Sequence, residues 1–276
     1  MRDGNPQPYV FGHSEREIER LKVQARLIDP ITRRFFAEAG IAPGMRVLDI
    51  GSGAGDVAFL AASMVGKEGE VVGVDRVPAA LETARVRAAE RSLGNVTFRE
   101  GDPADLSFER PFDAVLGRYV LQFQPDPAAM LRKVARHVRP GGVVVFHEID
   151  WGGLGSFPPA PTFERCCRWG VETLSRNGTE TRMGMKLHAA FVAAGLPQPR
   201  MRLEALIGGA DGSDVLRLVA DLVATLLPEM ERLGLTTAAT VGVDTLVERM
   251  REEGAATSTV FVGQNQVAAW SRTQER

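Results

Sequence analysis

The sequence predicts an open, doubly wound α/β fold in which seven strands, most of them parallel, are covered by helices on both faces. Three observations lead to this prediction. The apolar fraction of 44% and charged fraction of 25% are typical of a globular protein. From Met45 onwards, short apolar segments alternate regularly with amphipathic ones. The short segments are rich in β-branched residues and nearly continuously apolar, as is typical of parallel strands buried on both faces.

Each predicted strand is a short apolar segment that follows a turn. The strands are expected at 46–50, 70–75, 95–100, 112–117, 143–149 and 200–208, and the last one within 258–272. Helices are expected at 55–65, 78–92, 126–138, 162–176 and 185–194, and over 213–253 with a break at Pro228. The Arg139-Pro140-Gly141-Gly142 segment is expected to end the helix before the fifth strand.

The N-terminal region predicts two helices. Ser14 and Glu17 have the spacing of a capping box, so a helix is expected from Ser14 to about Ile28. A second is expected to start at Pro30, because proline is favoured in a first helical turn. We interpret residues 1–40 as a helical N-terminal region. Residues 41–276 are interpreted as one domain with helical insertions at about 152–195 and 210–254.

Charge and composition exclude some classes of partner. The net charge is −2 and neither sign is clustered, which argues against a nucleic-acid-binding surface. No segment approaches the roughly 20 continuous apolar residues of a membrane span. The two cysteines, Cys166 and Cys167, are adjacent, and the N-terminus lacks an apolar leader, so a cytoplasmic protein is expected.

A glycine-rich loop follows the first strand, within VLDIGSGAGDVAF (47–59). Glycines at alternate positions allow a tight turn and let a ligand approach the backbone at the next helix. Asp75 ends the second strand, where a carboxylate can accept two ribose hydroxyls. A tight turn without a ligand is one alternative. Dinucleotide binding is another, although the spacing is G-x-G-x-G rather than G-x-G-x-x-G.

Five segments in order make a more specific pattern. They are VLDIGSGAG, VVGVD, VTFREGD, FDAVLGRYVLQF and LRKVARHVRPGGVVVF. Over roughly residues 40–150 this set resembles the motifs of class I S-adenosylmethionine-dependent methyltransferases. Within that family the chain is similar to bacterial small-molecule methyltransferases, including ubiquinone-biosynthesis-like and natural-product enzymes. The resemblance implies a Rossmann-like fold and S-adenosyl-L-methionine as cofactor, with S-adenosyl-L-homocysteine as its product.

The resemblance also implies roles for individual residues. The backbone around Gly51, Ser52 and Gly53 would hold the methionine portion, while Asp75 would bind the ribose and Arg76 would lie along the adenine. The full set of implied cofactor-binding residues is Asp49, Gly51, Ser52, Gly53, Gly55, Asp75, Arg76, Asp102, Pro103, Gly117 and Arg118. Asp102 would accept from the adenine amino group, and Gly117 and Arg118 would face the methionine amine and carboxylate. Alternatively, Asp102 caps a turn and Arg118 forms a surface ion pair.

Catalytic candidates lie where the fifth strand ends. His147 or Glu148 could act as a base or hold the acceptor, or each could be a structural residue satisfied within the sheet. A base is needed only for an acceptor that starts protonated, since the sulfonium donor is already activated. The resemblance also implies that residues 1–40 form a helical lid over the cofactor, in which Tyr9 and His13 are candidates for gating or substrate contact. An ordinary loop with a helix cap is the alternative. No metal site is expected.

Together these patterns predict methyl transfer to a small, apolar or aromatic acceptor. Oxygen or carbon acceptors are favoured, in natural-product or quinone-type biosynthesis. The helical additions after the fifth strand would form the acceptor pocket. A nicotinamide-dependent oxidoreductase and a non-methylating S-adenosylmethionine-binding protein are the alternatives, and a homo-oligomer is possible.

Overall fold

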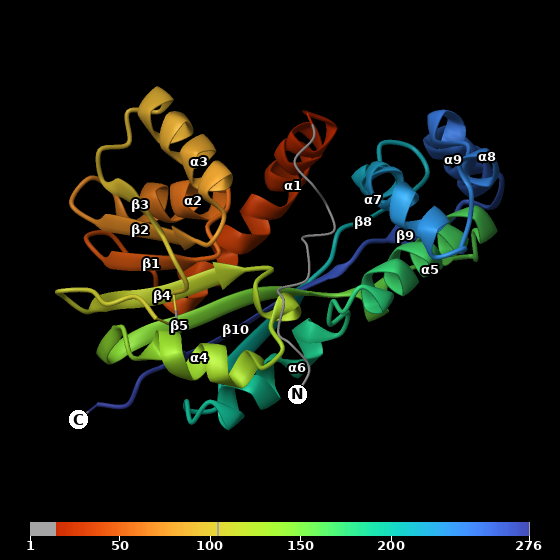
Figure 1. The fold of residues 1–276 in the computed structure, drawn as a ribbon. Helices are drawn as coiled ribbons and strands as arrows, with labels where there is room; N and C mark the ends of the chain where they lie inside the picture. Colours follow the sequence, from red (N-terminus) through yellow and green to blue (C-terminus); the bar gives the residue numbers. More distant parts are fainter. Residues whose placement is uncertain (1–14, 104, 276) are drawn as a thin grey trace. The chain divides into compact units, whose positions relative to one another are not determined.

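The chain forms two compact units, which Figure 1 shows in sequence colours. The computed structural model describes residues 15–103 and 105–275, with side chains from residue 27 onwards. The larger unit contains residues 25–149, 183–203 and 266–275, and the smaller one contains 15–24, 150–182 and 204–265. The expected insertion at about 152–195 is thus divided, because its second helix belongs to the larger unit.

The larger unit is built on a seven-stranded sheet, as predicted. Its strands are β1 (Arg46–Ile50), β2 (Glu70–Asp75), β3 (Val96–Glu100), β4 (Phe112–Arg118), β5 (Val138–Asp150), β7 (Arg200–Glu204) and β10 (Asn265–Arg272). Their order is β3-β2-β1-β4-β5-β10-β7. The pairings among β1 to β5 are parallel. The middle of β1 and β2 is completely buried, which explains their continuous apolar sequences.

Helices cover both faces of this sheet (Figure 1). They are α1 (Glu15–Ala39), α2 (Asp56–Val65), α3 (Pro78–Glu90), α4 (Pro127–Ala135) and α6 (Met183–Ala193). Leu131 of α4 and Phe191 of α6 share one core with Leu48 of β1 and Phe146 of β5. Burial of this apolar face fixes the sheet whose edge carries the candidate site.

Parallel register brings the carboxyl ends of four strands to the same edge of the sheet. Ile50 pairs with Val74 on one side and with Gly117 on the other, and Arg118 pairs with His147. The glycine loop, Asp75, Arg118 and the end of β5 therefore meet at this edge. Open α/β sheets bind ligands there.

The smaller unit packs helices beside a short antiparallel sheet. Its main helices are α5 (Pro161–Arg176), α7 (Asp214–Arg232), α8 (Ala238–Val241) and α9 (Leu246–Thr257). Its strands are β6 (Gly155–Phe157), β8 (Ile207–Gly208) and β9 (Val260–Val262), in the order β6-β9-β8. Phe163 of α5 meets Phe261 of β9 edge to face, with ring centroids 4.9 Å apart.

Two prolines that were expected to break helices lie inside them. Helix α1 is continuous through Pro30, and α7 is continuous through Pro228, so both predicted breaks are wrong. An internal proline removes one backbone hydrogen bond. Burial of an apolar face offsets this cost in each helix. The buried apolar residues around Pro30 are Ile28, Ile31, Phe35 and Phe36.

Other boundaries also differ from the sequence predictions. Residues 200–208 form two strands in different sheets, β7 and β8, and 258–272 is divided in the same way between β9 and β10. Alternation of apolar residues does not reveal which sheet a strand joins. The Arg139–Gly142 segment belongs to β5, and the pairing of β5 with β4 shifts register between Phe112 and Ala114.

Among the described helices, none has the length and apolar character needed to cross a lipid bilayer.

The packing around β2 yields a stability prediction. A Cβ at Gly73 would lie 2.7 Å from Cδ1 of buried Phe98 and 2.9 Å from Cβ of Ser52 in the glycine loop. Gly73→Ala should therefore destabilise the protein by about 1–3 kcal/mol, the usual cost of overpacking a core. Gly94→Ala is the matched control, because nothing lies within 4 Å of its added Cβ. Urea denaturation that shows equal midpoints for the two variants would refute this packing account.

Candidate cofactor site

The glycine loop between β1 and α2 depends on left-handed backbone conformations. Gly51, Gly53 and Gly55 have φ angles of 64°, 50° and 91°, which other residues adopt only at a cost. The Ser52 N–H donates to the Val74 carbonyl at 3.0 Å, and the Gly55 N–H to the Ser52 carbonyl at 2.8 Å. The loop is therefore a fixed backbone shape held against β2.

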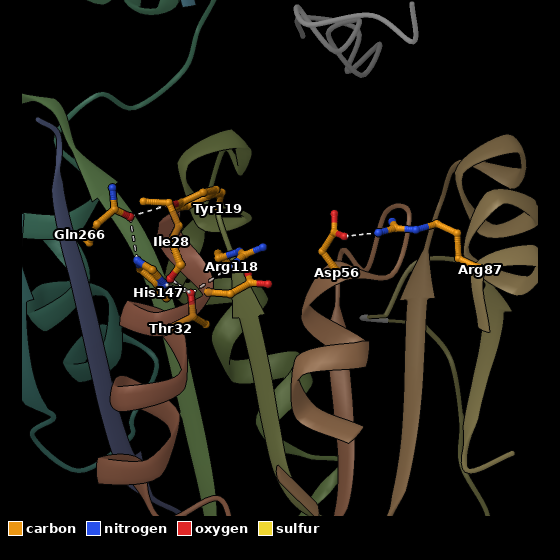
Figure 2. A network of polar contacts seen from close by, with 9 residues as sticks. Ile28, Thr32, Asp56, Arg87, Arg118, Tyr119, His147 and Gln266 are labelled. Carbon is orange, nitrogen blue, oxygen red and sulfur yellow. Dashed lines mark hydrogen bonds and ion pairs between the residues drawn. The ribbon is translucent and has the colours of Figure 1, made fainter. Parts of the chain in front are cut away.

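Two further contacts hold the far end of this loop. Arg87 of α3 donates to the Ala54 carbonyl at 2.6 Å and forms an ion pair with Asp56 at 2.5 Å (Figure 2). Asp56 is the first residue of α2, where the helix dipole favours a negative charge. The start of α2 is thereby fixed to α3.

The loop lies beside polar atoms that the protein leaves unsatisfied. Asp49 is 1% exposed, and neither carboxylate oxygen has a hydrogen-bond partner; the same is true of Ser52 Oγ. Burial raises the pKa of Asp49 well above its usual range. The Arg118 charge opposes this shift, as does the Ala58 N–H, which approaches outside hydrogen-bond geometry. Buried polar groups are normally paired, so these atoms fit a ligand that supplies donors, such as the cofactor's ammonium group.

Asp75 connects the glycine loop to the end of β2. Its Oδ2 accepts from the Gly53 N–H at 2.8 Å, and its Oδ1 accepts from the Val77 N–H at 2.9 Å. Each carboxylate oxygen can accept a second hydrogen bond. The half-buried carboxylate can thus hold the loop and still receive ribose hydroxyls.

The residues expected around the adenine lie at the ends of β2 and β3. Arg76 forms an ion pair with Asp102, and both side chains are partly exposed. The buried Pro103 lies next to Asp102, and its carbonyl is 3.0 Å from His137 Nε2. The two side chains proposed for the adenine thus contact each other.

Two residues at the end of β4 have different surroundings: Gly117 packs against Phe146, and Arg118 contacts α1. A Cβ at Gly117 would lie 2.7 Å from Phe146 Cε1. Arg118 is largely buried, and its Nη1 donates to Asp29 Oδ1 at 2.7 Å and to Thr32 Oγ1 at 3.0 Å (Figure 2). Arg118 is thus not a surface residue.

His147 lies in a buried polar network drawn in Figure 2. Its Nε2 is 2.9 Å from Gln266 Oε1, and its Nδ1 is 3.1 Å from Thr32 Oγ1. Tyr119 donates to the same Gln266 oxygen at 2.5 Å. Because that oxygen is an acceptor, this network assigns the proton of neutral His147 to Nε2. Burial, together with the Arg118 charge, lowers the pKa of His147 to about 3, although the Gln266 bond opposes this shift.

Glu148 is also fully buried, on the opposite face of β5. Its Oε1 accepts from the N–H groups of Val120 and Leu121 at 2.9 and 2.7 Å, and its Oε2 accepts from Gln122 at 3.4 Å. Burial raises the pKa of Glu148 to about 7, while these three N–H groups act in the opposite direction. Both carboxylate oxygens therefore have structural partners.

The structure thus brings most of the predicted residues to one sheet edge. Tyr9 and His13 lie outside the described residues. Sequence reasoning missed Thr32, Tyr119 and Gln266. No local motif connects them, since Gln266 reaches His147 from a strand 119 residues further along. Within the described ranges, no group of three or more His, Cys, Asp or Glu residues is placed to hold a metal ion.

Comparison with known proteins agrees with this geometry. A family model described as a methyltransferase domain matches residues 41–182. Aklanonic acid methyltransferase from Streptomyces sp. (strain C5) is 36% identical over 153 residues, which are 55% of this chain and 68% of that protein. Nocamycin O-methyltransferase from Saccharothrix syringae is 37% identical over 131 residues, 47% of this chain and 44% of the relative.

A quinone-related enzyme and solved structures extend the comparison. The 2-phytyl-1,4-naphtoquinone methyltransferase of Synechococcus elongatus is 43% identical over 101 residues, 36% of this chain and 43% of that protein. The YcgJ protein of Bacillus subtilis has a TM-score of 0.55 at 18% identity, covering 91% of this chain and all of that one. The [4+2]-cyclase SpnF has a TM-score of 0.53 at 19% identity, with 90% and 82% covered.

The structural neighbours confirm the Rossmann-like fold, and the family match covers the glycine loop, Asp75 and both candidate residues of β5. The chain is therefore a member of the class I S-adenosylmethionine-dependent methyltransferases.

Proposed function

We propose that this enzyme transfers a methyl group from S-adenosyl-L-methionine to oxygen or carbon of a small, largely apolar or aromatic acceptor. The observation that carries the proposal is Asp49, a buried carboxylate without a hydrogen-bond partner beside a left-handed glycine loop. The three relatives compared above, named for aklanonic acid, nocamycin and 2-phytyl-1,4-naphtoquinone, support an acceptor of this kind.

The residues at the sheet edge have separate roles in this proposal. Asp49 and the loop backbone hold the methionine end of the cofactor, Asp75 holds the ribose, and Asp102 with Arg76 binds the adenine. The cofactor supplies an activated sulfonium methyl group. The protein's contribution is alignment of the acceptor and exclusion of water, which can supply much of the rate.

The contacts of His147 and Glu148 support positioning rather than proton transfer. A base must reach the acceptor's proton with a free lone pair. Nε2 of His147 carries a proton, and its Nδ1 faces Thr32. Both oxygens of Glu148 accept backbone N–H groups. Neither group is therefore available as a base in this arrangement.

The smaller unit supports an apolar acceptor through its own pocket. This open pocket has a volume of about 580 Å³, and Trp151, Leu154, Cys167 and Val171 line it together with charged side chains such as Glu164, Arg168 and Glu172. The apolar part of this lining suits an aromatic ring.

The proposed reaction can be tested with a panel of acceptors. Release of S-adenosylhomocysteine should occur with hydroxylated aromatics and quinols but not with glycine or other small polar amines. Asp75→Ala should abolish this release. Turnover confined to polar amines would contradict the proposed acceptor class. Cofactor binding without turnover across the panel would favour a non-methylating protein.

The glycine loop gives a second prediction. Gly53→Val should leave the fold intact but lower S-adenosylhomocysteine affinity at least about 100-fold, because a branched side chain would occupy the space of the ligand. Gly212→Val is the matched control. Gly212 also has a positive φ (70° against 50°), and neither glycine has an atom within 4 Å of an added Cβ. Calorimetry should show normal binding for Gly212→Val. Normal binding for both variants would mean that the loop only turns the chain.

A further inference from the structure

The turn that follows β4 begins with a residue in a left-handed conformation and with N–H groups that no helical carbonyl accepts. Tyr119 has a φ of 60°, a left-handed conformation that is costly for a residue with a side chain. Its N–H donates to the His147 carbonyl at 2.9 Å. A short 3₁₀ helix over Leu121–Phe123 starts immediately afterwards. The first N–H groups of a helix lack partners within the helix, and here they are buried.

Glu148 supplies the acceptors for these donors from a neighbouring strand. Its carboxylate receives the N–H groups of three successive residues, 120 to 122, and it is itself completely buried. A buried carboxylate is costly unless such bonds compensate it. The carboxylate therefore caps this helix in place of a local side chain.

The turn at residues 120–122 contacts the glycine loop between β1 and α2. A Cβ built on Gly51 would lie 2.8 Å from Val120 Cγ2, so the two residues are packed together without room for a methyl group. Gly51 has a left-handed φ of 64° and precedes Ser52, whose hydroxyl is unpartnered. The Val120 side chain thereby restricts where Gly51, the first residue of the loop, can lie.

We propose that Glu148 is a positioning residue for the cofactor site, whose carboxylate holds the 120–122 turn and so keeps Val120 packed on Gly51. Glu148 acts through the backbone of the turn and does not contact the cofactor or the acceptor. This role of Glu148 rests on the cofactor site proposed above, but the contacts that hold the turn lie within the chain and are present in the free protein.

Two substitutions at Glu148 separate this role from others. Glu148→Gln keeps one carbonyl oxygen for Val120 and Leu121 but loses the second acceptor, whereas Glu148→Leu removes both. Calorimetric S-adenosylhomocysteine affinity should fall about 3- to 10-fold in Glu148→Gln and further in Glu148→Leu, as for loss of one and then several hydrogen bonds. Amide hydrogen exchange at residues 120–122 of the ligand-free protein should rise in the same order.

A matched control exists in the smaller unit. Glu253 also accepts a backbone N–H with its carboxylate, that of Thr162, at 3.0 and 3.4 Å. Glu253→Gln should leave both cofactor affinity and exchange at 120–122 unchanged. The conservative Glu148→Gln variant keeps the test decisive if Glu148→Leu does not fold.

A double-mutant cycle tests the route through Val120. Val120→Ala should weaken S-adenosylhomocysteine binding, and Glu148→Gln should then cost less in that background than alone, because coupled residues are not additive. Unchanged affinity in folded Glu148→Gln would overturn the proposal. Additive losses of affinity in the Val120→Ala and Glu148→Gln double variant would also overturn it. Reduced turnover with intact cofactor affinity and intact amide protection would overturn it as well, because Glu148 would then act as an acid–base group.

Discussion

The parallel register of β1, β2, β4 and β5 is the constraint on which the candidate site depends. It brings the ends of four strands to one edge, so residues as far apart in sequence as Ile50 and Gly117 become neighbours. Polar groups near this edge, among them Asp49, His147 and Glu148, are buried. Buried polar groups must find partners. The protein satisfies Glu148 and His147 internally, whereas the Asp49 carboxylate has no hydrogen-bond partner within the described residues.

This division between satisfied and unsatisfied groups supports the roles proposed above. The donors and acceptors of Glu148 and His147 have partners within the chain, as the proposed positioning roles of both residues require. Asp49 and Ser52 remain without partners beside backbone that only glycine adopts readily. This combination fits the proposed methyl transfer, in which the donor is already reactive and the main task of the protein is to align two molecules.

Much of the fold and the cofactor loop could be predicted from sequence because both depend on local patterns. Continuous β-branched segments indicated the parallel strands, and alternating glycines indicated the left-handed turns. The partners of His147 could not be predicted, since Thr32 and Gln266 come from the first helix and the last strand. Helix breaks at Pro30 and Pro228 were predicted wrongly, because burial of each helix outweighs one lost hydrogen bond. The division of residues 200–208 between two sheets likewise depends on tertiary packing.

We expect this sheet edge to bind S-adenosylmethionine through Asp49, the glycine loop and Asp75. Calorimetric titration of the wild-type chain with S-adenosylhomocysteine tests it most directly, with NAD as the competing ligand. We expect one saturable site for S-adenosylhomocysteine and no measurable heat of binding with NAD. The Asp49→Asn variant should show a smaller binding enthalpy for S-adenosylhomocysteine. Saturable binding of NAD with no response to S-adenosylhomocysteine would contradict the account.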